Sequence, residues 1–169
     1  MISTSLSKLE SQALNADLLL RIQVRRPLGV WATRIVVAEK ISVDQVKILG
    51  EMKCWAYKAL NGLQLDTMRV NSKSSPCIGH LIWSATMAWA LEETPCINAR
   101  LLAIRDEERQ HKRLVRYFER RGFRVFREVG SSPIDLPVRV VWGGAGSLMS
   151  ASCEKVLEKS SSLWISSVK

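Results

Sequence analysis

Short apolar runs separated by turn residues characterise the first 40 positions of the chain. Leu18–Arg25 and Val30–Ala38 are rich in branched side chains, which favour extended backbone. Between them lies Arg26-Pro27-Leu28-Gly29, a sequence typical of a turn. The pattern therefore predicts two strands joined by a short connection.

The next 30 positions continue the extended pattern. Val46–Tyr57 is interpreted as a strand, although the spacing of its start also fits a helix over Val43–Leu49. Asn61-Gly62 is a strong hairpin signal, and Leu63–Val70 after it alternates apolar and polar residues. We expect 46–57 and 63–70 to form an antiparallel pair.

The periodicity changes to that of helices after a polar loop, 71–75. From Pro76 to Thr94, apolar residues recur every three or four positions, which predicts a largely buried helix. Ala99–Ile104 has the length of a central strand. A second helix is expected from Asp106, with acidic residues favouring its positive end, to Gly122, which suits a left-handed C-cap. Its inward-facing residues are expected to be Leu114, Val115, Tyr117 and Phe118.

The two ends of the chain carry weaker signals. We interpret Phe123–Val129 and Val138–Trp142 as the last strands, with a bend or bulge in the glycine-rich stretch that follows them, and Cys153–Lys159 as a short terminal helix before a tail. Residues 1–15 have weak helical spacing and are expected to be flexible. The order of elements predicts one α/β (α+β) domain over residues 1–169, with a mixed, mostly antiparallel sheet and flanking helices.

Composition narrows the class of protein. The chain is 47% hydrophobic and 24% charged, as globular proteins are. Its longest apolar stretch, Ile78–Leu91, is shorter than the roughly 20 residues of a membrane-spanning helix, and no signal peptide is recognisable. We therefore expect a cytoplasmic or organelle-interior protein with no membrane partner. The four cysteines lie far apart and predict neither a disulfide framework nor a metal site.

The net charge of +9 is concentrated in one segment. Between Arg100 and Arg127 there are ten basic residues and four acidic ones, so this segment supplies six of the nine charges. Spacings of three and four residues place many of these charges on the expected second helix, where a solvated face is the ordinary interpretation. A nucleic acid or an acidic protein partner is the alternative.

The loop before the long helix is the best candidate for a binding site. A strand, a polar loop and a helix start in succession bring free backbone N–H groups to the positive end of a helix dipole, which suits phosphate. The loop here is Ser74-Ser75-Pro76-Cys77-Ile78-Gly79. An ordinary strand-to-helix connection is the alternative.

The segment Leu63–Phe123 resembles the core of the GNAT N-acetyltransferases, in which a strand, a pyrophosphate loop, a helix, a strand and a helix follow in order. In that family the loop has Arg or Gln, then Gly, then Gly or Ala, at the positions occupied here by Ser74, Cys77 and Gly79. Only Gly79 agrees, so the loop is divergent. The resemblance implies acetyl-coenzyme A as cosubstrate, without a metal. The implied binding residues are Met68, Arg69, Val70, Ser74, Ser75, Cys77, Ile78, Gly79, His80 and His111, the last of them on the pantetheine arm.

The resemblance also implies catalytic roles. Many family members place a tyrosine four residues before the Gly-Phe pair, here Gly122-Phe123, where it protonates the leaving thiolate. This chain has Phe118 at that position and Tyr117 beside it, so Tyr117 is the candidate acid if the helix is rotated. Asp66 is the candidate general base.

Each of these roles has a plainer alternative. Asp66 can be solvated or paired with Arg69, and Tyr117 can be ordinary core. Cys77 at a helix start is a minor candidate for a reactive thiol. For the whole chain the leading hypothesis is an N-acetyltransferase with an unknown amine acceptor. The rivals are an inactive GNAT-like binding module that docks through the basic helix at 109–121, and a sensor of acyl-coenzyme A.

Overall fold

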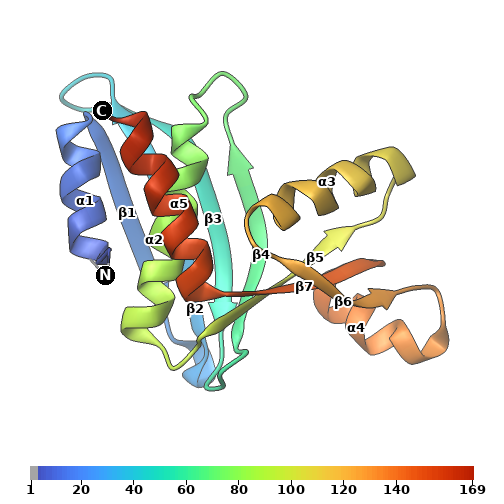
Figure 1. The fold of residues 1–169 in the computed structure, drawn as a ribbon. Coiled ribbons are helices and arrows are strands. Elements are labelled where there is room, and N and C mark those ends of the chain that lie inside the picture. The colour runs from blue at the N-terminus through green and yellow to red at the C-terminus, as the bar shows by residue number, and fades with distance from the viewer. Residues whose placement is uncertain (1–3) are drawn as a thin grey trace.

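A single seven-stranded sheet organises the molecule (Figure 1), in the order β1-β2-β3-β4-β5-β7-β6. The structure is a computed structural model and describes residues 4–169. The strands are β1 (Leu18–Arg25), β2 (Trp31–Lys40), β3 (Val46–Ala56), β4 (Leu63–Val70), β5 (Asn98–Ile104), β6 (Arg124–Val129) and β7 (Gly146–Ser152). Only β4 and β5 are parallel, and every other neighbouring pair is antiparallel. The predicted mixed, mostly antiparallel sheet with flanking helices is confirmed.

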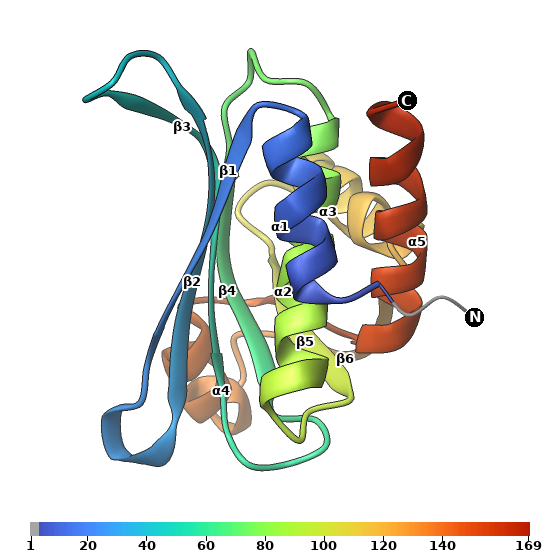
Figure 2. The same cartoon turned by 90° about the vertical axis from the view of Figure 1, so that its left-hand side faces the viewer.

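The helices α1 (Leu6–Asn15), α2 (Cys77–Glu93) and α5 (Cys153–Ser167) form a layer on one face of β1–β4 (Figure 2). The other helices are α3 (Glu108–Arg120) and α4 (Leu136–Trp142). α2 packs between α1 and α5, and α3 follows β5 beyond the edge of β4 (Figure 1). Among residues 4–169, no helix covers the opposite face of β1, β2 and β3, which we call the open face (Figure 2).

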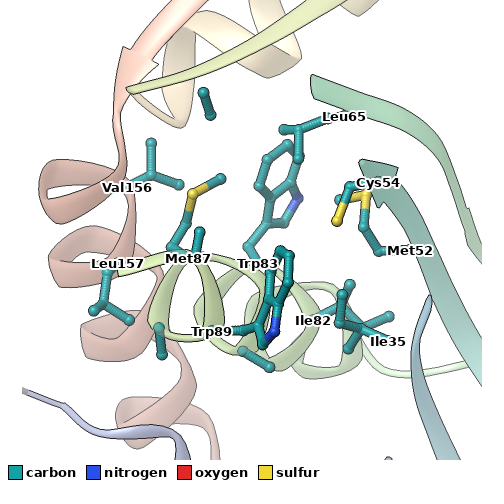
Figure 3. Packing of buried hydrophobic residues seen from close by; sticks show 14 of the residues in the cluster. Ile35, Met52, Cys54, Leu65, Ile82, Trp83, Met87, Trp89, Val156 and Leu157 are labelled. Atoms are coloured by element: carbon teal, nitrogen blue, oxygen red, sulfur yellow. The ribbon is translucent and has the colours of Figure 1, made fainter. Parts of the chain in front are cut away.

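The core lies between this helix layer and the sheet (Figure 3). α2 is apolar around its whole circumference, so it is buried along nearly all its length. Met87 points toward Val156 on α5, and Trp83 rises toward Leu65 on β4. Burial of each such large side chain contributes about 1.5–3 kcal/mol, which fixes α2 and the loop before it against the sheet.

Most predicted elements are confirmed. The segment 46–56 is extended rather than helical, and it pairs with β4 in the predicted antiparallel hairpin. α3 ends as expected at Gly122, whose φ of +102° is the left-handed conformation that favours glycine. On α3, Leu114, Val115 and Phe118 pack against the core, whereas Tyr117 is partly exposed.

The N-terminal segment is more regular than its sequence suggests. Ser5 caps α1 by accepting a hydrogen bond from the Lys8 N–H, and the side chains of Leu9 and Ala13 are fully buried. Two buried residues one turn apart are sufficient to dock a ten-residue helix, although they give little periodicity. Residues 1–3, part of the stretch expected to be flexible, lie outside the described residues.

The prediction of a strand at Val138–Trp142 is wrong. This segment is the helix α4, with Pro137 in its first turn and Gly143 at its C-cap, where φ is +79°. Val140 and Val141 are exposed, so the branched residues that suggested a strand have no sheet neighbour. The last strand is β7, whose sequence GSLMSAS is small and polar yet pairs on both sides with β5 and β6.

The terminal helix is longer than predicted. α5 continues beyond Lys159, the expected end of the helix, to Ser167. Ser160 and Ser161 are buried on this helix, which packs against α2, and Trp164 is fully buried at the next turn. Close packing of two helices favours small residues at their contact.

Candidate functional site

The two parallel strands separate soon after they meet. β4 and β5 pair only at Leu63 with Ala99 and at Gln64 with Arg100, although β4 continues to Val70 and β5 to Ile104. Beyond Gln64, no strand among residues 4–169 pairs with the edge of β4 that faces β5. A free strand edge presents N–H and C=O groups to any extended chain that lies along it. We call this opening the split.

A β-bulge lies at the start of the split. Lys53 pairs with Thr67 and Cys54 with Leu65, which leaves Asp66 without a partner on β3. Bulges change the direction of a side chain and are common beside active sites. Asp66 is exposed and, within residues 4–169, its side chain makes no hydrogen bond or ion pair, so the alternative pairing with Arg69 is absent there.

β4 leads through Met68, Arg69 and Val70 into the predicted phosphate loop. The Asn71 N–H donates to the Leu49 carbonyl at 2.8 Å, and the Asn71 side-chain and backbone oxygens accept from Lys73 and Ser74. The loop is therefore folded on itself and anchored to β3. This geometry places the first turn of α2 at the end of the split.

The first turn of α2 keeps unused hydrogen-bonding groups. Ile78 N–H donates to the Ser75 carbonyl, and Cys77 N–H makes a long contact of 3.5 Å with Ser75 Oγ. Within residues 4–169, Gly79 N–H has no partner, and the buried Ser74 Oγ has none either. Unpaired donors at a helix N-terminus are the groups that bind anions.

Arg121 is a residue of this site that sequence reasoning missed. It leaves the C-terminal end of α3 and lies against the first turn of α2, where its Nη1 donates to His80 Nδ1 at 3.3 Å. Its Nη2 lies 3.8 Å from the position a Cβ on Gly79 would occupy. Its guanidinium stacks over the rings of Trp83 and Tyr117, at 5.4 and 4.9 Å from their centroids. In the sequence it was one of ten basic residues in a solvated segment, with nothing to distinguish it.

The charge of Arg121 is not neutralised within the described residues. No carboxylate there lies within ion-pairing distance, and its Nε is buried without a hydrogen-bond partner. Burial lowers the pKa of Arg121, an effect opposed by Tyr117. Burial, followed by the nearby Arg121 charge, also lowers the pKa of His80. Neither side chain forms an ion pair with a carboxylate within residues 4–169.

A cavity of about 250 Å³ lies beside Arg121. Its walls come from three helices, and no acidic residue lines it. The lining residues are His80, Tyr117, Arg120, Arg121, Lys159, Ser160 and Leu163. We call this hollow the helix-side cavity. Its basic lining, which includes the Arg121 Nε that has no partner within residues 4–169, makes it suitable for an anion.

Tyr117, rather than Phe118, reaches this cavity. The Tyr117 hydroxyl accepts a hydrogen bond from Trp83 Nε1 at 3.1 Å, while Phe118 packs edge-on against Trp83 and Phe123. Tyr117 is therefore the aromatic side chain of α3 that faces the helix-side cavity. Asp66, however, lines a different hollow, on the open face.

His111 does not join the loop residues. Its buried ring contacts Ser147 Oγ at 3.1 Å, the Ile104 carbonyl at 3.2 Å and Arg105 Nη2 at 3.3 Å. His111, Ser147 and Arg105 line a separate groove of about 410 Å³ between α3 and β6–β7. Because its ring is held by Ser147 and Arg105, a structural role explains its burial.

The cysteines and carboxylates form no further centre. All four cysteines are free; Cys77 is half-buried, and burial raises the pKa of Cys54 and raises that of Cys153 to about 12. Within residues 4–169, no cluster of three His, Cys, Asp or Glu residues has the geometry to hold a metal ion. No helix in the same range is long and apolar enough to cross a membrane.

Comparison with known proteins places the chain by its fold alone. No protein-family model and no curated protein matches its sequence. A solved structure that it resembles is that of an uncharacterized protein from Bacillus halodurans. The two share 15% sequence identity with a TM-score of 0.50, over 82% of this chain and 67% of the other. At this identity the resemblance shows a common arrangement of strands and helices.

Proposed function

We propose that this protein is an acetyl-coenzyme A dependent N-acetyltransferase of the GNAT type. The observation that carries the proposal is the split between β4 and β5, which ends at an anchored loop and an uncapped helix start. An extended chain with amide groups, ending in phosphates, matches a free strand edge that leads to free N–H donors. The pantetheine and pyrophosphate of coenzyme A have this form.

Specific residues fit the cosubstrate. Gly79 N–H and the unpaired Ser74 hydroxyl are available to the pyrophosphate, and Arg121 with His80 supplies the cation that the divergent loop lacks. The free edge of β4 at Met68, Arg69 and Val70 is available to the pantetheine amides. Ser75, Cys77 and Ile78 shape the turn between these two parts.

The proposed reaction uses two groups of the protein, Asp66 on the open face and Tyr117 in the helix-side cavity. The acceptor nitrogen forms the new C–N bond, the C–S bond breaks, and the thiolate leaves with the electron pair. Asp66 on the open face accepts the proton lost by the amine, directly or through water, and Tyr117 is the candidate to protonate the thiolate. Such a protein acts where acetyl-coenzyme A is present, in the cytoplasm or an organelle interior.

One observation favours a second candidate, an inactive GNAT-like module or acyl-coenzyme A sensor. Asp66 and Tyr117 line different hollows, so the two proposed catalytic groups share no cavity. The exposed basic side chains of α3, among them Arg109, Arg113 and Arg120, would then bind an acidic protein or a nucleic acid.

Ligand-induced stabilisation tests the proposal first. At a concentration 100 times the dissociation constant, coenzyme A or acetyl-coenzyme A stabilises the fold by about 2.7 kcal/mol, which raises Tm by roughly 5–10 °C for a chain of this size. Absence of a shift at millimolar ligand would refute both the enzyme and the sensor.

Replacement of Asp66 separates the enzyme from the sensor. We expect Asp66→Asn to lower kcat about 100-fold in an acetyl-transfer assay, as loss of a general base does, with the coenzyme A shift unchanged. A protein that binds coenzyme A but acetylates no amine in a broad panel is the sensor.

A further inference from the structure

The open face carries a groove that is built by the register of four strands. Two cross-strand rows of side chains border it: Gln23, Arg34, Lys53 and Thr67 form one, and Arg25, Ala32, Trp55 and Gln64 form the other. Ala32 is the one small side chain in the second row, between Arg25 and Trp55. The hollow over it has a volume of about 540 Å³.

Asp66 stands at the end of this groove that is nearest the split. The bulge places it on β4 between the two rows, with its carboxylate free within the described residues. Neighbouring strands are about 4.8 Å apart, so Lys53 on β3 starts one strand away and Arg25 on β1 starts about 14 Å away. The groove is therefore acidic at the end formed by Asp66 and basic along the rest, where Lys53 and Arg25 lie.

The basic charge of the groove exceeds what the protein itself neutralises. Arg34 is paired with Glu51, with Nε and Oε2 2.7 Å apart, and this hydrogen bond lowers the pKa of Glu51. Arg25 and Lys53 form no ion pair within residues 4–169. Two free cations therefore face a single free carboxylate.

From this arrangement we infer that the acceptor bound in the open-face groove is a small primary amine that also carries an oxyanion, a carboxylate or a phosphate. The inference rests on the proposed function, because it is the split that makes Asp66 the place of the amine. The amine lies at Asp66 and the oxyanion at Lys53 and Arg25, with the acceptor's carbon skeleton against Trp55. A purely cationic polyamine is excluded by repulsion from the two free cations.

Matched pairs of amines test the inference. The full chain is titrated by calorimetry or NMR with phenylalanine against phenethylamine, and with phosphoethanolamine against ethanolamine. The members of each pair differ chiefly in the oxyanion. We expect the anionic member to bind about tenfold more tightly, the effect of one charge-assisted hydrogen bond. The two pairs distinguish carboxylate from phosphate.

Variants that lack the basic side chains test whether Arg25 and Lys53 cause the preference for anionic amines. The double variant Arg25→Gln, Lys53→Gln is expected to abolish the preference for the anionic member, while phenethylamine binds no more weakly than before because repulsion by the two cations is removed. Arg21→Gln is the matched control, since Arg21 is exposed on the same strand but outside the groove. Equal binding of both members of each pair, or a preference that survives in the double variant, would overturn the inference.

Two further outcomes separate this inference from the proposed function. If anionic amines bind through Lys53 and Arg25 but coenzyme A gives no thermal shift, the transferase proposal fails. The groove is then still a binding site for amines that carry an oxyanion. If coenzyme A binds and acetylation shows no dependence on the oxyanion, the transferase stands and this inference fails. A single-stranded oligonucleotide that binds through the same two residues, where small amines do not, would also overturn it.

Discussion

The helix-side cavity and the open-face groove are both basic, but they present their charge in opposite ways. Arg121 lies half-buried on the rings of Trp83 and Tyr117, fixed by helices that the core holds in place. Arg25 and Lys53 extend from an uncovered sheet into solvent. A charge removed from water is screened less and exerts a stronger field than a solvated one. The same residue type can therefore fix a phosphate in one place and select a substrate in the other.

The largest expected difference between the two sides is in stability. Trp83 is almost fully buried, so Trp83→Ala is expected to lower the free energy of unfolding by about 3–5 kcal/mol. Trp55 is only half-buried on the open face, and Trp55→Ala is expected to cost about 1 kcal/mol. Urea unfolding followed by circular dichroism measures both. Equal losses would show that the open face is covered in solution.

Ligand affinity is expected to change next most strongly. Arg121→Gln removes the cation that lies against the first turn of α2, and we expect coenzyme A to bind about tenfold more weakly or worse. Arg113→Gln is the control, because it removes an equal charge from the exposed face of the same helix. Calorimetry in moderate salt distinguishes them. A similar loss in both variants would mean that only the overall charge of α3 matters.

The smallest expected effect is a dependence on pH that His80 confers. Its pKa is lowered from the ordinary 6.5, mainly by burial, so folding opposes its protonation, and the free protein loses stability as the pH falls below about 6.5. A bound phosphate favours the protonated form of His80 and so raises its pKa. Coenzyme A is therefore expected to bind a few-fold more tightly at pH 6 than at pH 7.5. His80→Gln should flatten both trends. If the pH dependence of stability and of coenzyme A binding is unchanged in that variant, other titrating groups cause it.

The candidate site was only partly predictable from the sequence. The loop 74–79 was found because a strand, polar residues and a helix start follow one another locally. Arg121 was not found, since its partners His80 and Trp83 are about 40 positions away and one helix apart. The open-face groove was also missed, because Ala32 forms a hollow only when register places it between Arg25 and Trp55.

The errors in the predicted fold also arise because contacts between distant segments are not visible in the local sequence. Val138–Trp142 has the composition of a strand but no sheet edge to join, and it forms α4 under the control of Pro137 and Gly143. β7 has few strand-favouring residues, yet two neighbouring strands supply its hydrogen bonds. In both cases the tertiary context outweighs local propensity.

By itself, the sequence determined the fold class, the place of the long buried helix α2 and the position of the loop before it. These features depend on periodicity and on turn residues, which act over a few positions. Only the tertiary structure decided which basic residue approaches the loop, which aromatic of α3 faces the cavity, and where β4 parts from β5. Those features depend on strand register and helix packing between distant segments, which local patterns do not record.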